Sequence, residues 1–253
     1  MKEIKKWRMP STPRWLHFFF LLAVILTALA ILMKTQVIRI NQFFVNDGSV
    51  VGADIARYQG DVNMEKLSGE GIQFLYIKTT EGSSHTDIRF EENMQKARAA
   101  GMPAGAYHFF SMDSGGEKQA QHYIETVGDL SGCLCPAVDV EFYGDKQDNP
   151  PPAEIVRAEL HAFLTTLEEE YHVKPVIYCG RAILDAYIDE TFDDYPFWIR
   201  SVYAPVRFAT GHAWTIWQYT DHGRLEGYNG IETHIDLDVL HPDAELDDLI
   251  VGY

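Results

Sequence analysis

The sequence predicts an α/β protein in which eight strands close into an irregular barrel, preceded by one membrane-spanning helix. Two observations predict the barrel: after residue 50, short apolar runs alternate with helical patterns, and eight such runs occur. Strands that alternate with helices form a parallel sheet covered by helices, and eight strands suggest a closed barrel. A third observation, an apolar block near the N-terminus, predicts the separate helix.

The apolar block covers residues 15–33, with His17 as its one ionisable side chain. Nineteen residues at about 1.5 Å each make a helix of roughly 28 Å, close to the hydrocarbon thickness of about 30 Å. The segment before it is basic and contains Lys2, Lys5, Lys6, Arg8 and Arg14 against Glu3. Since positive flanks stay inside, we expect 1–14 in the cytoplasm, a signal anchor at 15–33 and the remainder outside the cell membrane.

A cleaved signal peptide is the alternative to an anchor. Ala28-Leu29-Ala30 offers a small-x-small cleavage site, although the apolar run continues through Met33. Cleavage there would give a secreted protein, so both alternatives export the remainder of the chain. Residues 34–50 are expected to be a stalk, and residues 51–253 a catalytic domain.

Charge is distributed unevenly along the chain. Residues 41–253 hold 14 basic and 36 acidic side chains, a net charge of −22. Such a domain repels nucleic acid, whose binding depends on Lys and Arg at phosphates. The three cysteines, Cys133, Cys135 and Cys179, match neither a disulfide framework nor a zinc site, and are expected to be small buried hydrophobes.

The alternating pattern assigns each element a range. Strands are predicted at 51–56, 73–79, 103–110, 134–141, 174–179, 196–200, 213–219 and 234–240, and helices at 87–100, 116–127, 152–171 and 181–188. The segments joining the last three strands are too short or irregular for full helices, so the barrel should be imperfect there. In such barrels the chemistry lies at the carboxyl ends of the strands.

Acidic residues gather at these strand ends. Asp139 and Glu141 close one strand, Asp54 closes the first, and Asp236 and Asp238 lie in the last. Residues i and i+2 share a strand face, with Cα atoms about 6.5–7 Å apart. Two carboxyl groups on one face can differ in pKa, so that one stays protonated and the other ionised, as glycoside hydrolysis requires. Two alternatives without glycosidase chemistry are acids of a solvent-exposed loop and a Mg²⁺ or Ca²⁺ site. We expect no metal and no cofactor.

Aromatic residues at the strand ends favour a carbohydrate ligand, because rings stack on the apolar faces of sugars. Each ring taken alone is more typical of a core, so the prediction rests on their clustering. The candidate substrate-binding residues are Tyr107, Phe109, Tyr178, Trp198 and Trp217, with Gln218 beside Trp217.

Several blocks resemble glycoside hydrolase family 25, the muramidases of the Chalaropsis type. They are VGADIARYQGDVNMEKL, FLYIKTTEGSSHTDIRFEENMQKARAAGMPAGAYHFF, PAVDVEFYG, PVIYCG, PFWIRSV and WTIWQYTDHGRLEGYNGIETHIDLDVL, in order over about residues 51–242. The resemblance implies an irregular barrel of eight strands and about five helices. It also implies a lysozyme that cuts peptidoglycan between N-acetylmuramic acid and N-acetylglucosamine with retention of configuration.

The resemblance also implies roles for four acids. Glu141 would be the general acid, and Asp139 would orient or stabilise the substrate's N-acetyl group or act at the anomeric carbon. Asp54 and Asp236 would complete the site. Two positions depart from the family: Arg200 stands where a small residue is usual, where it would narrow a subsite or pair with an acid, and Asp238 replaces a common Asn.

Two other functions fit the same pattern. A chitinase-like N-acetylhexosaminidase would use the same Asp-x-Glu chemistry, and a wall-binding module could keep the fold without turnover. The expected partners are peptidoglycan glycan strands and, through the N-terminal helix, the membrane; a monomer is expected.

Overall fold

The computed structural model describes residues 13–35 and 38–252, so most of the predicted cytoplasmic segment, 1–14, lies outside the described residues. The chain divides into two compact units between Arg39 and Ile40. In the first unit, helix α1 (Arg14–Lys34) has a mean hydropathy of 2.7 and no buried side chain. By length and composition α1 is a candidate membrane span or signal segment.

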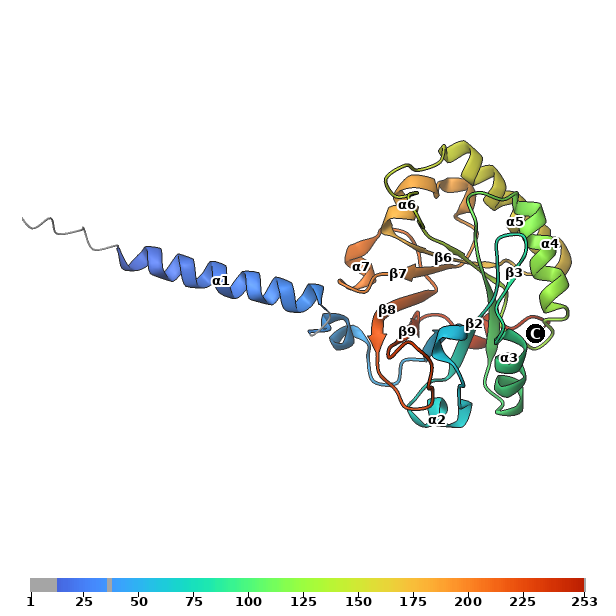
Figure 1. The fold of residues 1–253 in the computed structure, drawn as a ribbon, viewed down its shortest axis with the longest axis horizontal. Helices are drawn as coiled ribbons and strands as arrows, with labels where there is room; N and C mark the ends of the chain where they lie inside the picture. Colours follow the sequence, from blue (N-terminus) through green and yellow to red (C-terminus); the bar gives the residue numbers. More distant parts are fainter. Residues whose placement is uncertain (1–12, 36–37, 253) are drawn as a thin grey trace, which may run out of the picture. The chain divides into compact units, whose positions relative to one another are not determined.

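The second unit is an eight-stranded closed barrel, as predicted (Figure 1). Around it run β1, β9, β8, β7, β6, β5, β4 and β2, and β1 pairs with β2 to close the ring. A short β3 (His85–Thr86) extends β2 as a hairpin. The barrel strands are β1 (Val51–Ile55), β2 (Phe74–Glu81), β4 (Ala104–Phe109), β5 (Ala137–Val140), β6 (Val176–Gly180), β7 (Phe197–Arg200), β8 (Ile216–Gly223) and β9 (Ile235–Leu240).

The last strand breaks the parallel pattern that alternation predicted. Strand β9 runs antiparallel to both β8 and β1, whereas the other neighbouring barrel strands are parallel. The segment between β8 and β9 holds no helix, and a parallel return would need a crossover of a dozen or more residues. The amino end of β9 therefore lies at the same rim as the carboxyl ends of its neighbours.

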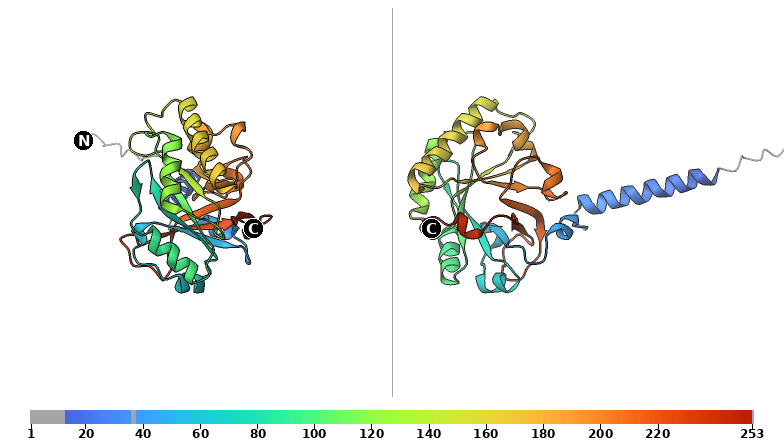
Figure 2. Two further views of the ribbon diagram at one scale, coloured as in Figure 1. Left: turned by 90° about the vertical axis from the view of Figure 1, so that its right-hand side faces the viewer. Right: turned by 180° about the vertical axis from the view of Figure 1, so that it is seen from behind.

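Helices cover the outside of the barrel (Figure 2). The four predicted helices are confirmed as α3 (Phe90–Ala99), α4 (Gly116–Val127), α5 (Ala153–Tyr171) and α6 (Arg181–Tyr187). Two short helices that lack a clear apolar period were not predicted, α2 (Met64–Gly69) and α7 (Val206–Ala209). The three cysteines are free and buried, as expected of small hydrophobes.

The second half of the predicted stalk packs on the barrel. Residues Ile40–Phe44 form a 3-10 helix, η1, in which Asn41 is only 1% exposed. The Asn41 side-chain amide donates hydrogen bonds to the carbonyl oxygens of Ser201 (2.7 Å) and Tyr219 (2.9 Å). The packed unit thus begins within the range 34–50 that the sequence assigns to the stalk.

Close packing of α4 on α5 gives a test of the outer layer. A Cβ added at Gly116 would lie 1.7 Å from the Glu159 carbonyl oxygen, whereas one at the neighbouring Gly115 would meet Glu159 at an ordinary 3.6 Å. Overpacking of this kind costs about 1–3 kcal/mol, and each kcal/mol shifts Tm by about 2–4 °C in a protein of this size. We expect Gly116→Ala to lower Tm by at least about 3 °C in thermal unfolding of the detergent-solubilised chain.

Gly115→Ala is the matched control for that measurement. Its backbone has φ −64°, which alanine adopts without strain. Equal Tm values for the two variants would contradict the assigned contact between α4 and α5.

Candidate active site

The predicted acids meet in one cavity at the rim where the parallel strands end. Asp54 on β1, Asp139 on β5, Glu141 just after β5 and Asp236 near the start of β9 all line it. Tyr107, Tyr178 and Trp198 line the same cavity, together with Ala56, Tyr58, Gln59, Lys78 and Glu232. The fold therefore brings together all four acids that sequence reasoning selected.

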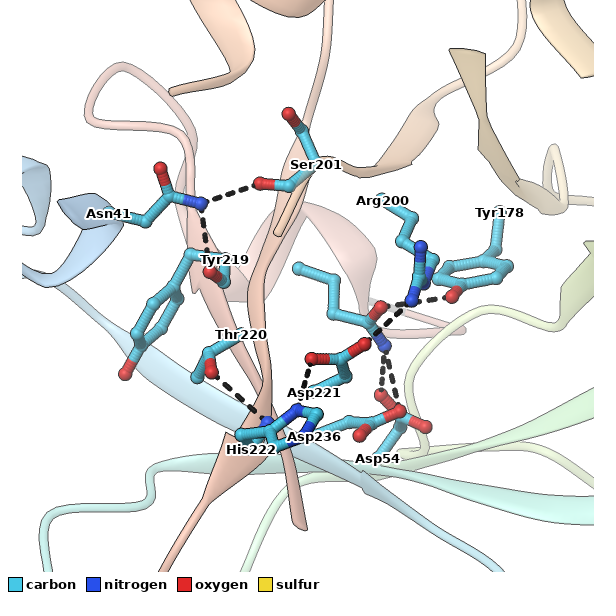
Figure 3. A network of polar contacts seen from close by, with 11 residues as sticks. Asn41, Asp54, Tyr178, Arg200, Ser201, Tyr219, Thr220, Asp221, His222 and Asp236 are labelled. Carbon is cyan, nitrogen blue, oxygen red and sulfur yellow. Dashed lines mark hydrogen bonds and ion pairs between the residues drawn. The ribbon is translucent and has the colours of Figure 1, made fainter. Parts of the chain in front are cut away.

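Gln218 on β8 ties Asp54 to Asp236 through hydrogen bonds, and Figure 3 shows these two acids close together. The two acids are direct partners across the antiparallel β1–β9 pair, so their side chains lie on the same barrel face. The Gln218 amide nitrogen donates to Asp54 Oδ2 (2.8 Å) and to Asp236 Oδ2 (3.2 Å), and its carbonyl oxygen accepts from the Tyr178 hydroxyl (3.0 Å). Gln218 is 1% exposed, so it acts within this network beneath the cavity surface.

Asp139 is a buried carboxyl group with other ionisable side chains around it. It is 9% exposed, and its Oδ1 makes no hydrogen bond to any of the described residues. Burial raises the pKa of Asp139 well above its usual value, and the neighbouring Glu141 adds to the rise, while the Lys78 ammonium opposes it. Since Asp139 lines the cavity and its Oδ1 is buried without a partner, this carboxyl group is a candidate for contact with a ligand.

Glu141 experiences a different balance of charges. Burial is again the largest effect and raises its pKa, but the Arg200 guanidinium and the Tyr178 phenol counteract it, and Asp221 raises it further. Arg200 itself forms an ion pair with Asp221, with 2.7 Å between the guanidinium nitrogen and the carboxylate oxygen (Figure 3). The sequence left open whether Arg200 narrows a subsite or pairs with a core acid; its partner is Asp221 on β8, whose side chain is 20% exposed.

Three of the predicted aromatic residues form the walls of the cavity. Tyr178 and Trp198 contact each other edge to face, with ring centroids 4.7 Å apart. The Trp198 indole N–H donates to Asp238 Oδ1 (2.8 Å), which fixes the ring. Phe109 lies at the edge of this group, outside the cavity lining, with its ring 4.8 Å from the Lys78 ammonium.

Trp217 does not belong to the cavity, contrary to the prediction. Side chains alternate along a strand, so a Gln218 that faces Asp54 and Asp236 turns Trp217 to the outside of the barrel. There its indole N–H donates to the Ser201 carbonyl (3.0 Å), and its ring lines a separate apolar groove beside η1. The prediction was wrong because it considered only that Trp217 lies near a strand end, and not that side chains alternate along the strand.

Sequence reasoning missed several residues that line the cavity or adjust its charge. Lys78 stands inside the apolar run of β2, and a lysine at an inward position of a buried strand was a usable signal. Tyr58 and Gln59 come from the 3-10 helix η2 (Arg57–Gln59) and Glu232 from the β8–β9 loop, and the Gln59 amide donates to Glu232 Oε2 (3.1 Å). No local pattern in the sequence marks these three residues.

Asp238 allows a test of the electrostatics around the site. It is fully buried, and its Oδ2 makes no hydrogen bond within the described part of the chain. Burial raises its pKa well above 3.8, with a hydrogen bond from Trp198 opposing the rise. A group with a raised folded-state pKa holds its proton in the fold after the unfolded chain has lost it, so its contribution to stability falls as pH rises above about 3.8.

We expect Asp238→Asn to remove this pH-dependent loss of stability, while the asparagine side-chain oxygen still accepts the hydrogen bond from the Trp198 indole N–H. The variant should therefore have a higher Tm than the natural chain at pH 7 and a smaller advantage at pH 4. Asp243→Asn, at a side chain 93% exposed, is the control and should change Tm little at either pH. If the Tm difference between Asp238→Asn and the natural chain did not grow with pH, the raised pKa of the buried Asp238 would be contradicted.

Comparison with known proteins agrees with this geometry. The sequence profile of glycosyl hydrolases family 25 matches residues 53–228. YegX of Escherichia coli K12 is 30% identical over 187 residues, 72% of this chain and 67% of that protein. Lysozyme M1 of Streptomyces globisporus is 30% identical over 201 residues, 72% of this chain and 65% of that protein.

A solved structure gives the same result for the fold. A family 25 glycosyl hydrolase from Bacillus anthracis superposes with a TM-score of 0.73 at 41% identity, covering 78% of this chain and 92% of its own. The profile match spans well over half of the chain and contains three of the four acids in the cavity. The chain is therefore a glycoside hydrolase and belongs to glycosyl hydrolases family 25.

Proposed function

We propose that the protein is a muramidase that cleaves the β-1,4 bond between N-acetylmuramic acid and N-acetylglucosamine in peptidoglycan. The observation that carries this proposal is the pair Asp139, which is buried, and Glu141, which is half-buried: two carboxyl groups with raised pKa values at one cavity whose walls include tyrosine and tryptophan rings. Such rings suit a sugar, and such a pair suits glycoside hydrolysis. The similarity to lysozyme M1 agrees with this substrate.

Glu141 is the general acid in this proposal. Its raised pKa keeps the carboxyl proton in place at the pH where most carboxyl groups have lost theirs. It protonates the glycosidic oxygen as the bond to the anomeric carbon breaks. Asp139, whose ionised form the Lys78 ammonium favours, stabilises the positive charge that develops on the sugar or the substrate's N-acetyl group. Water then attacks the anomeric carbon from the face that the leaving group occupied and gives its proton to Glu141, so the reaction retains configuration.

Asp54 and Asp236 have supporting roles. Both receive a hydrogen bond from Gln218, and Gln218 also accepts from Tyr178, which lies beside Glu141. These hydrogen bonds fix the orientation of the Asp54, Asp236, Gln218 and Tyr178 side chains before substrate arrives. Such preorganisation lowers the cost of reaching the transition state.

We also propose that α1 remains as an anchor, with one pass through the cell membrane and residues 51–253 outside as the catalytic domain. The length of α1, its mean hydropathy of 2.7 and the absence of buried side chains along it support this assignment. Recovery of a mature form that begins near Ile31 would instead show cleavage after Ala30.

The substrate is tested by incubating the full-length protein with purified peptidoglycan and, separately, with chitin, followed by mass analysis of the products. The muramidase proposal expects fragments of peptidoglycan with N-acetylmuramic acid at the new reducing end and no release from chitin. Release from chitin would favour a hexosaminidase. Binding to peptidoglycan without any product would favour a wall-binding module.

Glu141→Gln tests the general acid. Glutamine keeps the shape but has no transferable proton, and general acid catalysis contributes about 10²–10⁴-fold. We expect kcat on peptidoglycan to fall by at least about 100-fold, while binding to the wall stays close to that of the natural chain. Glu117→Gln, on the exposed surface of α4, is the control for the loss of a carboxylate. Turnover within about tenfold of the natural chain would reject Glu141 as the acid.

Variants of Arg200 and of Asp221 test the pKa of Glu141, because the two substitutions should shift this pKa in opposite directions. The Arg200 cation lowers this pKa and the Asp221 anion raises it. Arg200→Met should therefore move the alkaline limb of the kcat profile to higher pH, because Glu141 keeps its proton longer. Asp221→Asn should move the same limb to lower pH. Shifts in the same direction, or none, would show that the pair does not control the proton on Glu141.

A further inference from the structure

The link between α1 and the barrel is short enough to restrict where the barrel can be. Helix α1 ends at Lys34, and the packed unit begins at Ile40, with residues 35–39 between them. An extended chain spans at most about 3.6 Å per residue, so six steps from Lys34 to Ile40 reach roughly 20 Å. If α1 is an anchor, as proposed above, Ile40 stays within that distance of the membrane surface.

The point at which the chain enters the barrel is fixed. Asn41 is buried, and its two hydrogen bonds to the carbonyls of Ser201 and Tyr219 hold η1 against β7 and β8 (Figure 3). The surface that carries η1 is therefore the part of the barrel nearest to the anchor along the chain, and η1 cannot leave that surface without breaking buried hydrogen bonds.

This surface carries three phenylalanine side chains and one arginine close together. We call Phe43, Phe44, Arg207 and Phe208 the aromatic patch. Phe43 is 83% exposed, Phe208 69% and Phe44 37%. The Arg207 guanidinium joins η1 to α7, because it lies 5.1 Å from the Phe44 ring centre and 4.8 Å from that of Phe208. Phe43, Phe44 and Arg207 also line the apolar groove that Trp217 borders.

Exposed phenyl rings are costly in water, since each Å² of apolar surface removed from water is worth about 25 cal/mol. At a membrane surface the same rings enter the boundary between head groups and acyl chains, where aromatic side chains are enriched. A cation beside them suits anionic head groups, and the patch holds Arg207 and no acid in a domain whose net charge is −22. The composition of the patch therefore fits a lipid surface.

We propose that the aromatic patch inserts into the outer surface of the membrane in which α1 is anchored, and so holds the barrel in one orientation. The proposal rests on the anchor proposed above. Tyr203 lies on the same β7–α7 segment and lines a groove that also borders Glu141 and Arg200. The bound orientation would thus place one end of the region around Glu141 close to the bilayer.

Fluorescence quenching tests the insertion in the full-length protein. Four variants each add one exposed cysteine for a bimane label, Phe43→Cys and Phe208→Cys in the patch and Ile88→Cys and Ile155→Cys as controls, and the three natural cysteines are buried. Ile88 and Ile155 are also exposed apolar residues, 81% and 53%, but they lie before α3, which packs on β2 and β4, and on α5, which packs on α4 and α6. The proteins are reconstituted into vesicles of phosphatidylcholine and phosphatidylglycerol that contain a lipid with a nitroxide on its head group.

We expect labels at 43 and 208 to be quenched at least about threefold more than labels at 88 and 155, because nitroxide quenching is confined to short range. Flotation of the vesicles reports the anchor separately. Protein that floats but shows equal quenching at all four positions would overturn the patch and leave the anchor standing. Protein that does not float would overturn the anchor, and the patch proposal with it.

Discussion

The antiparallel pairing of β9 with β1 is the constraint on which the candidate site depends. It sets Asp54 opposite Asp236 and, through the pairing of β9 with β8, brings Gln218 within hydrogen-bonding distance of both. Because side chains alternate along a strand, a register shift of one residue would turn Asp236 to the outside of the barrel. The polar network exists only in the register that the closed barrel imposes.

The acids in and around this network lie close together and are largely removed from water. Asp54, Asp139, Asp236 and Asp238 are each buried enough that burial is the largest influence on the pKa, and each pKa is raised. Such a cluster lowers stability at neutral pH, and the apolar walls of the barrel must offset this cost. The benefit is chemical, since neighbouring carboxyl groups in a dry setting hold their protons differently and can divide the roles of acid and stabiliser.

Sequence reasoning located the strands well because each is a short apolar run bounded by polar residues, and the α4 range agrees to the residue. It failed where the outcome depends on contacts distant in sequence. The direction of β9 follows from an irregular connection, and the outward position of Trp217 follows from the side on which Gln218 finds its partners. Lys78 and Asp221 act on Asp139 and Glu141 from other strands, and no spacing along the chain records this.

The reversed final strand also affects how such a barrel can change over evolution. Strands β8 and β9 are joined at the rim of the cavity by residues 224–234, a loop with no helix that contributes Glu232 to the cavity. Doubling the length of a flexible loop costs only about 0.6 kcal/mol of closure entropy. Residues 227–232 of this loop are held to residues 58–63 by backbone hydrogen bonds. Insertions that reshape the rim at little risk to the fold are therefore confined to the few loop positions outside that stretch.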